Sequence, residues 1–170
     1  MSSRDSYPGM NCSVGAALEI LGERWSFLVI REAFLGSRRF DQFQANLGIA
    51  RNVLTTRLHT LVAEDVLARN RYQERPERYE YVLTEKGRAL YPIIVALMAW
   101  GDRWASPRNG PPAILVDRET LRPLEPALVD RQTGAPIELG KVRLVPGPGA
   151  NGATRRRLEA MQRAAAARKP

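Results

Sequence analysis

The order of sequence patterns between residues 22 and 83 constrains the fold more strongly than any other feature of this chain. Short amphipathic segments separated by glycines come first, and two segments of alternating polar and apolar residues follow, on either side of the charged stretch 74–78. Apolar residues three or four positions apart indicate helices, whereas strict alternation indicates strands. The sequence therefore predicts a mainly α-helical fold in which a helix-turn-helix precedes a two-stranded hairpin, or wing.

Glycine, threonine and proline set the expected ends of these elements. Gly22, Gly36 and Gly48 each follow a helical pattern, as is typical of helix C-termini. Thr84 is the expected N-cap of a long last helix, which Pro92 should kink or divide into two segments. The expected helices cover residues 14–21, 25–35, 40–47, 49–64 and 84–104, and the expected strands cover 67–73 and 79–83.

The helix expected at 49–64 has two distinct faces when its residues are placed at 100° intervals. One side carries Leu54, Leu58, Leu61 and Val62, and the other carries Asn52, Thr56 and His59, with Thr55 on the flank. Amides and hydroxyls on a helix held by leucines suit the major groove of DNA, where such groups bond to base edges. An ordinary surface helix would have the same pattern.

The charged hairpin after this helix favours the DNA interpretation. In winged domains the hairpin lies over the sugar-phosphate backbone, where Arg75 or Arg78 would make positioning contacts. A solvated turn of mixed charge is the alternative. The expected base contacts are Asn52, Thr55, Thr56 and His59, and the expected backbone contacts are Arg39, Arg51, Arg57, Arg75 and Arg78.

The helix expected at 84–104 is apolar nearly all round. Its large apolar residues are Leu90, Ile93, Ile94, Leu97, Met98, Trp100 and Trp104. They cannot all face one small core, so a second covering surface is needed, and the same helix of another subunit supplies it most simply. Cover by the C-terminal region is the alternative. On this helix the expected homodimer interface contains Ile94, Leu97, Met98, Trp100 and Trp104.

The charge balance favours a polyanionic partner. The 170-residue chain has a net charge of +8 and a pI near 10.4, and residues 105–170 hold 12 basic against 6 acidic residues. One cysteine and one histidine leave no ligand set for a zinc ion, and they favour a reducing compartment. The longest apolar run, 89–100, is too short to cross a bilayer, and no apolar leader precedes it. We expect a cytoplasmic, nucleoid-associated protein that binds double-stranded DNA.

No catalytic constellation competes with this interpretation. The sequence has no Gly-rich phosphate loop and no His-Glu metal motif, and the acidic pair Glu64 and Asp65 falls at the end of an expected helix. We therefore expect no enzymatic activity, no cofactor and no metal.

The C-terminal third is expected to form an appendage to a DNA-binding and dimerisation domain at 1–104. Residues 105–112 have the composition of a linker. Residues 115–124 are echoed 13 positions later by 128–137, and each copy suggests a strand, a turn and a strand. With residues 141–145 they predict a small β element within 113–149. The basic segment 150–170 is expected to be a frayed tail, either solubilising or in contact with DNA phosphates.

Several short motifs between Cys12 and Trp104 together resemble a known family. They are Cys12, Gly22-Glu23-Arg24-Trp25, Arg31-Glu32, Gly36, Arg38-Arg39-Phe40, Phe43, Val53-Leu54-Thr55, Arg57-Leu58, Leu61, Tyr79-Glu80-Tyr81, Leu83-Thr84 and Gly87. In this order they resemble the HxlR family of bacterial winged-helix regulators, which is related to the MarR group. The resemblance implies a sequence-specific transcriptional regulator that binds a pseudo-palindromic operator, with half-sites about 34–36 Å apart. It also implies a dimer formed by the first helix, which contains Leu18, and the long last helix.

The same resemblance implies a response to an effector or to thiol chemistry. Some members of the family sense electrophiles or oxidants through a cysteine near the N-terminus, and Cys12 stands at that position. A buried, unreactive cysteine is the alternative. Because the chain has no second cysteine, any disulfide would join two subunits or a small thiol. Residues 113–149 are also similar to a zinc-ribbon-like extension of some relatives, but without its paired cysteines, so metal binding is not implied.

Two other functions remain open at this stage. A winged fold can also act as a protein or RNA interaction module, which would present apolar anchors on the helix at 49–64. A small-molecule sensor would need a pocket between the dimer helix and the winged domain, lined by Trp25, Phe34, Tyr91 and Trp100. Aromatic residues at this spacing are also compatible with a simple core.

Overall fold

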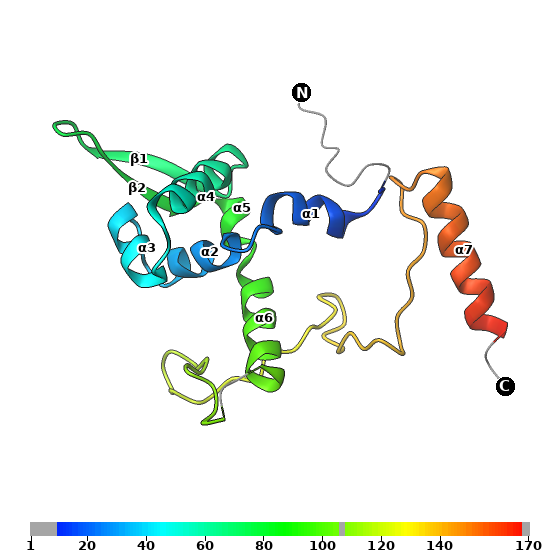
Figure 1. Ribbon diagram of the computed structural model, residues 1–170. Helices are drawn as coiled ribbons and strands as arrows, with labels where there is room; N and C mark the ends of the chain where they lie inside the picture. The colour runs from blue at the N-terminus through cyan, green and yellow to red at the C-terminus, as the bar shows by residue number, and fades with distance from the viewer. Residues whose placement is uncertain (1–9, 106–107, 168–170) are drawn as a thin grey trace. The chain divides into compact units, whose positions relative to one another are not determined.

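The computed structural model describes residues 10–105 and 108–167, and these residues form two compact units. One unit covers 17–126, and the other combines 10–16 with 127–167. The elements in chain order are α1 (Ser13–Leu21), α2 (Ser26–Phe34), α3 (Phe40–Leu47), α4 (Arg51–Ala63), β1 (Leu67–Gln73), β2 (Arg78–Leu83), α5 (Glu85–Arg88), α6 (Tyr91–Trp104) and α7 (Gly152–Ala167) (Figure 1). Residues 106–107 of the expected linker and 168–170 of the expected tail lie outside the described residues.

The core of the first unit lies between α2, α3, α4 and the start of β1. Its fully buried side chains include Phe43 of α3, Ile30 of α2 and Leu67 of β1, and α4 contributes Leu54, Leu58 and Leu61. These three leucines confirm the apolar face expected for α4, and burial of each stabilises the fold by about 1.5–3 kcal/mol. The core thus fixes which side of α4 points outward.

The hairpin expected after α4 is confirmed. β1 and β2 pair antiparallel, with Leu67 opposite Leu83 and Arg71 opposite Tyr79, and β2 begins at Arg78, one residue earlier than expected. The segment before α3 adds to the other edge of β2, because the Tyr81 N–H donates to the Arg38 carbonyl at 2.7 Å. The wing is therefore tied to the helix-turn-helix through backbone hydrogen bonds.

The long helix expected at 84–104 is divided into α5 and α6, as Pro92 predicted. Thr84 caps α5 by accepting the Gly87 N–H at 3.0 Å. Pro92 lies in the first turn of α6, where its missing N–H costs no helical hydrogen bond. The joint redirects the chain, so that α6 leaves the winged domain as a separate helix (Figure 1).

The two copies of the repeat adopt the same turn, but they do not form the expected strands. The Asp117 N–H donates to the Arg122 carbonyl, and 13 residues later the Asp130 N–H donates to the Ala135 carbonyl. Each turn is closed by only one isolated β-bridge. It joins Val116 to Pro123 in the first copy and Val129 to Pro136 in the second. Residues 141–145 form no strand either.

The expectation of a frayed tail is wrong for residues 152–167, which form α7. Two features favour this helix. Its composition is dominated by Ala and Arg, both strong helix formers. In addition, the Asn151 side chain accepts the Thr154 N–H at 2.9 Å, which satisfies one of the free donors at the helix start.

Candidate nucleic-acid interface

The outward face of α4 presents the four residues expected to contact bases. Asn52, Thr55, Thr56 and His59 are all exposed. The Thr55 hydroxyl donates to the Arg51 carbonyl at 2.8 Å, and the Thr56 hydroxyl donates to the Asn52 carbonyl at 3.0 Å. These bonds orient both side chains and leave the hydroxyl oxygens able to accept hydrogen bonds. The face carries no large apolar anchor of the kind that an interaction module would present.

The turn before α4 is built from one glycine and one buried side chain. Gly48 ends α3 with φ +59°, a left-handed conformation that favours glycine. Ile49 then inserts into the core with 3% of its surface exposed. This short connection sets the direction of α4 relative to α3.

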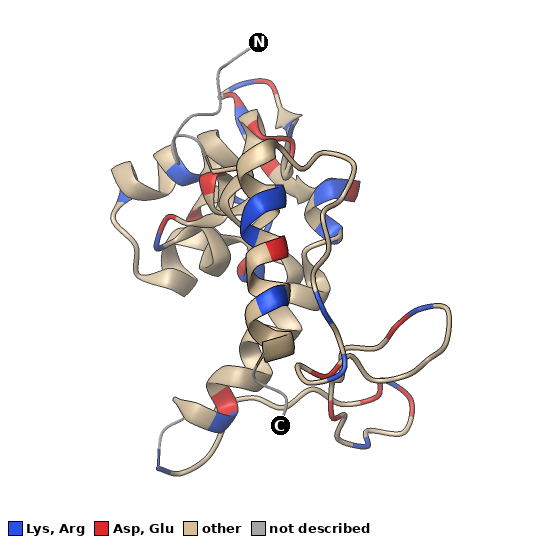
Figure 2. Ribbon diagram, turned by 90° about the vertical axis from the view of Figure 1, so that its right-hand side faces the viewer, with Lys and Arg blue, Asp and Glu red and all other residues tan. Residues whose placement is uncertain are grey.

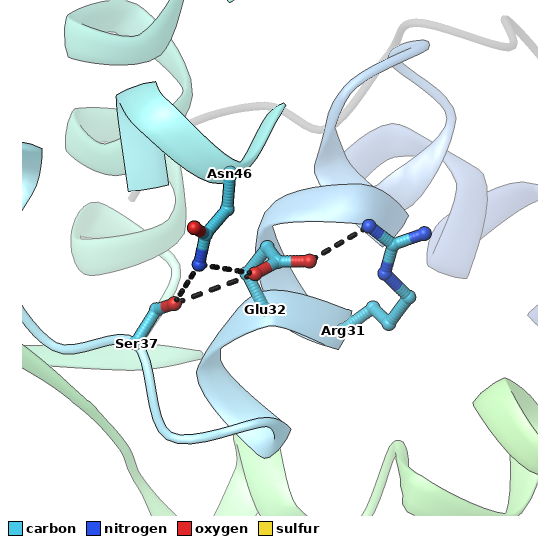
Figure 3. A network of polar contacts seen from close by, with 4 residues as sticks. All are labelled: Arg31, Glu32, Ser37 and Asn46. Carbon is cyan, nitrogen blue, oxygen red and sulfur yellow. Dashed lines mark hydrogen bonds and ion pairs between the residues drawn. The ribbon is translucent and has the colours of Figure 1, made fainter. Parts of the chain in front are cut away.

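A partly buried polar network connects α2 to α3 (Figure 3). The Glu32 carboxylate is buried, and it accepts hydrogen bonds from Arg31 Nη2 at 2.7 Å and Asn46 Nδ2 at 3.0 Å. Ser37 Oγ, in the turn between the helices, donates to Glu32 Oε2 at 3.4 Å and accepts from Asn46 Nδ2 at 3.0 Å. The sequence pointed to Arg31 and Glu32 only as a family motif, and nothing in its periodicity identified Asn46 or Ser37 as their partners.

Two of the arginines expected to contact the DNA backbone lie at the N-termini of α3 and α4. The Arg39 guanidinium lies over the Tyr72 ring at 4.6 Å, and that of Arg51 lies over the Phe40 ring at 4.8 Å. Both residues are exposed. Stacking of this kind restrains the guanidinium while its N–H edge stays available to a phosphate.

Arg57 has a different environment from the other arginines that were expected to contact the DNA backbone. Its side chain is only 15% exposed, and Nη1 lies 3.7 Å from Glu23 Oε2. This ion pair joins α4 to the turn between α1 and α2. The geometry therefore gives Arg57 a role in holding α4, apart from any contact with phosphate.

The wing combines free and paired charges. Arg71 forms ion pairs with Glu74 and Glu77, each at 3.4 Å. Arg75 and Arg78 are exposed, and no carboxylate among the described residues forms an ion pair with either of them. Both glutamates of the tip therefore pair with Arg71, and Arg75 and Arg78 are left without an ion pair among the described residues.

The apolar residues expected at a dimer interface are largely uncovered within one chain. Leu97 is 50% exposed, Trp100 is 60% exposed and Trp104 is 67% exposed, while Leu18 of α1 is 41% exposed. Ile94 and Met98 are half-buried, and Ile94 packs against the core. Residues 113–126 do not cover the exposed side chains of α6.

The aromatic residues expected to line a sensor pocket do not line either of the two cavities described below. The rings of Phe34 and Tyr91 contact each other with centroids 5.1 Å apart, Phe34 being half-buried against the core and Tyr91 45% exposed. The cavities found in this unit lie elsewhere. One of about 280 Å³ lies between the end of α6 and the segment 114–126, and one of about 610 Å³ lies along residues 115 and 122–126.

Cys12 is exposed and directly precedes α1. Hydrogen bonds from the backbone N–H groups of Gly15 and Val14 lower the pKa of its thiol, and the nearby Arg157 guanidinium lowers it further. A helix N-terminus and a cation both favour the thiolate, which is the nucleophilic form of cysteine. The expected alternative of a buried cysteine is therefore wrong.

Two further searches of the described residues bear on other kinds of site. Across 10–105 and 108–167, no three His, Cys, Asp or Glu side chains gather in an arrangement that could hold a metal ion. Among the described helices, none combines the length and apolar character that a bilayer span requires.

Comparison with known proteins assigns the winged unit. Residues 20–109 match the family model described as HxlR-like helix-turn-helix. A relative from Mycobacterium tuberculosis, described as an HTH-type transcriptional regulator, is 46% identical over 137 residues, which cover 81% of this chain and 87% of the relative.

Solved structures extend the similarity to most of the chain. The crystal structure of PA1607, described as a candidate transcription factor, has a TM-score of 0.73 at 34% identity, and the match covers 82% of this chain and 97% of that one. PA1374 from Pseudomonas aeruginosa has a TM-score of 0.62 at 38% identity, with 86% and 100% covered. The redox regulator HypR in its oxidised form has a TM-score of 0.52 at 31% identity, with 56% and 100% covered. The chain belongs to the HxlR-like helix-turn-helix family of transcriptional regulators.

Proposed function

We propose that this regulator binds a pseudo-palindromic operator as a homodimer, with α4 of each subunit in a major groove. The observation that carries the proposal is the polar outer face of α4, whose orientation is fixed by three buried leucines on the opposite side of the helix. Asn52 and Thr56 supply amide and hydroxyl groups for base edges, and Thr55 and His59 lie beside them. The protein acts on chromosomal DNA at the nucleoid.

The wing and the arginines beside α4 provide contacts that do not depend on sequence. Arg75 and Arg78 reach the sugar-phosphate backbone from the hairpin, while Arg39 and Arg51 reach it from the helix-turn-helix. Such contacts fix the register of α4 and make binding sensitive to salt. Arg57 supports α4 from behind through Glu23.

Dimerisation is proposed through α1 and α6, whose exposed apolar residues need a second surface. Leu18, Leu97, Trp100 and Trp104 form that surface, and Ile94 and Met98 lie next to it. A two-fold dimer buries the same patch on both subunits. It also sets the two copies of α4 at the spacing of operator half-sites.

An oxidant is the proposed effector, and Cys12 is its target. The lowered pKa and the exposure of Cys12 support this, as does the similarity to HypR, which is described as a redox regulator. The thiolate attacks the O–O bond of a peroxide, takes one oxygen to become a sulfenic acid and releases hydroxide. A thiol, either a small molecule or Cys12 of a second copy, then condenses with the sulfenic acid to give a disulfide and water.

The test of base readout compares two variants on operator and random duplexes. Asn52→Ala with Thr56→Ala is expected to lower the operator-to-random affinity ratio at least tenfold, since one good base contact contributes about 1–3 kcal/mol of discrimination. Arg75→Ala should instead weaken both complexes alike and reduce the slope of log K against log salt by about one. Full discrimination by the α4 variant would contradict the proposed role of these residues.

A further inference from the structure

α7 carries charges in an order that opposes its own helix dipole. Arg155, Arg156 and Arg157 lie in its first two turns, and its first turn has no acidic residue. The N-terminus of a helix is positively polarised, so cations at this end lower helix stability and anions raise it. A phosphate bound near these arginines would therefore relieve a repulsion that is built into the helix.

One side of α7 is occupied by contacts within its own unit. Thr154 Oγ1 donates to the Asn11 side-chain oxygen at 3.1 Å, and Gln162 Nε2 donates to the Leu144 carbonyl at 3.0 Å. Leu158 lies between these residues on the same side and is half-buried. This face fixes α7 to its surroundings.

The opposite side is basic and open. At 100° per residue, Arg156 and Arg163 project away from Leu158, and Glu159 and Ala160 lie between them on either flank of this face. Both arginines are exposed, and no carboxylate of the described residues pairs with either. α7 contains one acidic residue, Glu159, among four arginines, and Figure 2 colours the basic and acidic positions along the ribbon.

The other two arginines in the first two turns of α7 each interact with residues of the same chain. Arg155 Nε donates to the Ala150 carbonyl at 3.1 Å. Arg157 lies close enough to Cys12 to lower the pKa of its thiol. Arg156 and Arg163 are thus the pair that is free to bind an external anion.

We propose that this face of α7 is a second DNA-binding surface, which contacts the phosphodiester backbone independently of sequence. The inference rests on the proposed function, because DNA is the polyanion that a regulator already engages. Arg156 and Arg163 are two helical turns apart, about 10 Å along the axis. Duplex DNA carries one charge per about 1.7 Å of its axis, so both guanidiniums can meet phosphates of one duplex.

An anionic membrane fits this helix less well than DNA. Membrane-surface helices bury an apolar face rich in Leu, Phe or Trp. α7 has no aromatic residue, its Leu158 is half-buried within the protein, and Met161 is its one large exposed apolar side chain, at 53%. The alanines around Arg156 and Arg163 add little apolar area but allow close approach to a backbone.

The test uses the full chain carrying Arg156→Ala and Arg163→Ala. Alanine is the best helix former, so α7 should persist, which circular dichroism checks. Binding to a random-sequence duplex is titrated at several salt concentrations by fluorescence anisotropy. The slope of log K against log salt should fall by about 2 per protomer, because each lost phosphate contact removes about 0.9.

The matched control removes the same charge elsewhere. Arg118→Ala with Arg131→Ala takes two exposed arginines from the two repeat turns, and this variant should keep the wild-type slope within about 0.5. Equal slopes for wild type and the α7 variant would overturn the inference, and so would equal losses in both variants.

Two further readouts separate the possible failures. Loss of binding to phosphatidylserine vesicles in the α7 variant, with an unchanged DNA slope, would assign the face to lipid and overturn the inference. A wild-type protein that shows no operator preference, but whose salt slope depends on Arg156 and Arg163, would contradict the proposed function while supporting this inference.

Discussion

Glu32 illustrates how one residue joins two helices of the helix-turn-helix unit. Its buried carboxylate bonds to Asn46 of α3 and to Ser37 in the turn. We expect Glu32→Ala to lower the free energy of unfolding by about 1–3 kcal/mol, because the buried Ser37 hydroxyl and the Asn46 amide lose their acceptor. Urea denaturation measures this change.

The control for Glu32 is a carboxylate in an exposed ion pair. Glu23 is 66% exposed and lies 3.7 Å from Arg57, so Glu23→Gln should cost less than about 1 kcal/mol. Similar losses for the two variants would mean that the Glu32 network contributes no more than a surface contact.

Cys12 yields a pH prediction at the same scale. Because the pKa of its thiol lies below the ordinary value, more thiolate is present near neutral pH than in a free cysteine. As the pH is raised, the rate of alkylation by iodoacetamide should therefore increase at a lower pH than it does for N-acetylcysteine. Arg157→Ala should move the midpoint of this pH–rate profile to higher pH. A pH profile that coincides with that of N-acetylcysteine would contradict the oxidant proposal.

At the scale of elements, the joint at α5 depends on a glycine. Gly87 is buried, and a Cβ there would overlap the Val66 carbonyl oxygen and lie 3.0 Å from Leu83 Cδ2. Gly87→Ala should destabilise the fold by about 2 kcal/mol or more, since the obstructing atom belongs to the backbone.

A second glycine provides the control for this joint. A Cβ at Gly101 of α6 would meet nothing within 4 Å, so Gly101→Ala should stabilise the protein by about 0.5–1 kcal/mol through helix propensity. Thermal denaturation of both variants measures the difference. Equal melting temperatures would mean that α5 is not packed as described.

α6 supplies the second prediction at this scale. Leu97 lies at the centre of the proposed dimer interface and is 50% exposed in one chain. Leu97→Glu should shift the protein from dimer to monomer in sedimentation equilibrium, because two carboxylates would be buried per interface. Leu139→Glu, at a position that is 95% exposed, should leave the dimer intact. A dimer that persists in the Leu97 variant would place the interface elsewhere.

Across the whole molecule, the fold was predictable from the sequence where local patterns decide it. The spacing of Leu54, Leu58 and Leu61 set the faces of α4, and the alternation in β1 and β2 gave the hairpin to within one residue. These patterns involve neighbours along the chain, so no tertiary information was needed.

The parts of the structure that the sequence did not predict depend on contacts between residues far apart in the chain, or on local effects that oppose one another. Glu32 and Asn46 are 14 positions apart. Arg57 of α4 forms an ion pair with Glu23, which lies in the turn before α2. The repeat suggested strands, but each copy forms only a turn closed by one isolated bridge. The sequence-based prediction missed α7 because this segment has few apolar residues with which to pack. The N-cap at Asn151 and the high helix propensity of Ala and Arg nevertheless favour a helix.

The central claim is that this regulator reads a DNA sequence through α4. The most direct measurement is an anisotropy titration of the purified protein against duplex fragments from its own genomic neighbourhood and against random duplexes of equal length, at two salt concentrations. We predict that one fragment binds at least about 10³-fold more tightly than random DNA, and that this ratio holds as salt rises while both affinities fall. Equal affinity for every duplex would contradict the account.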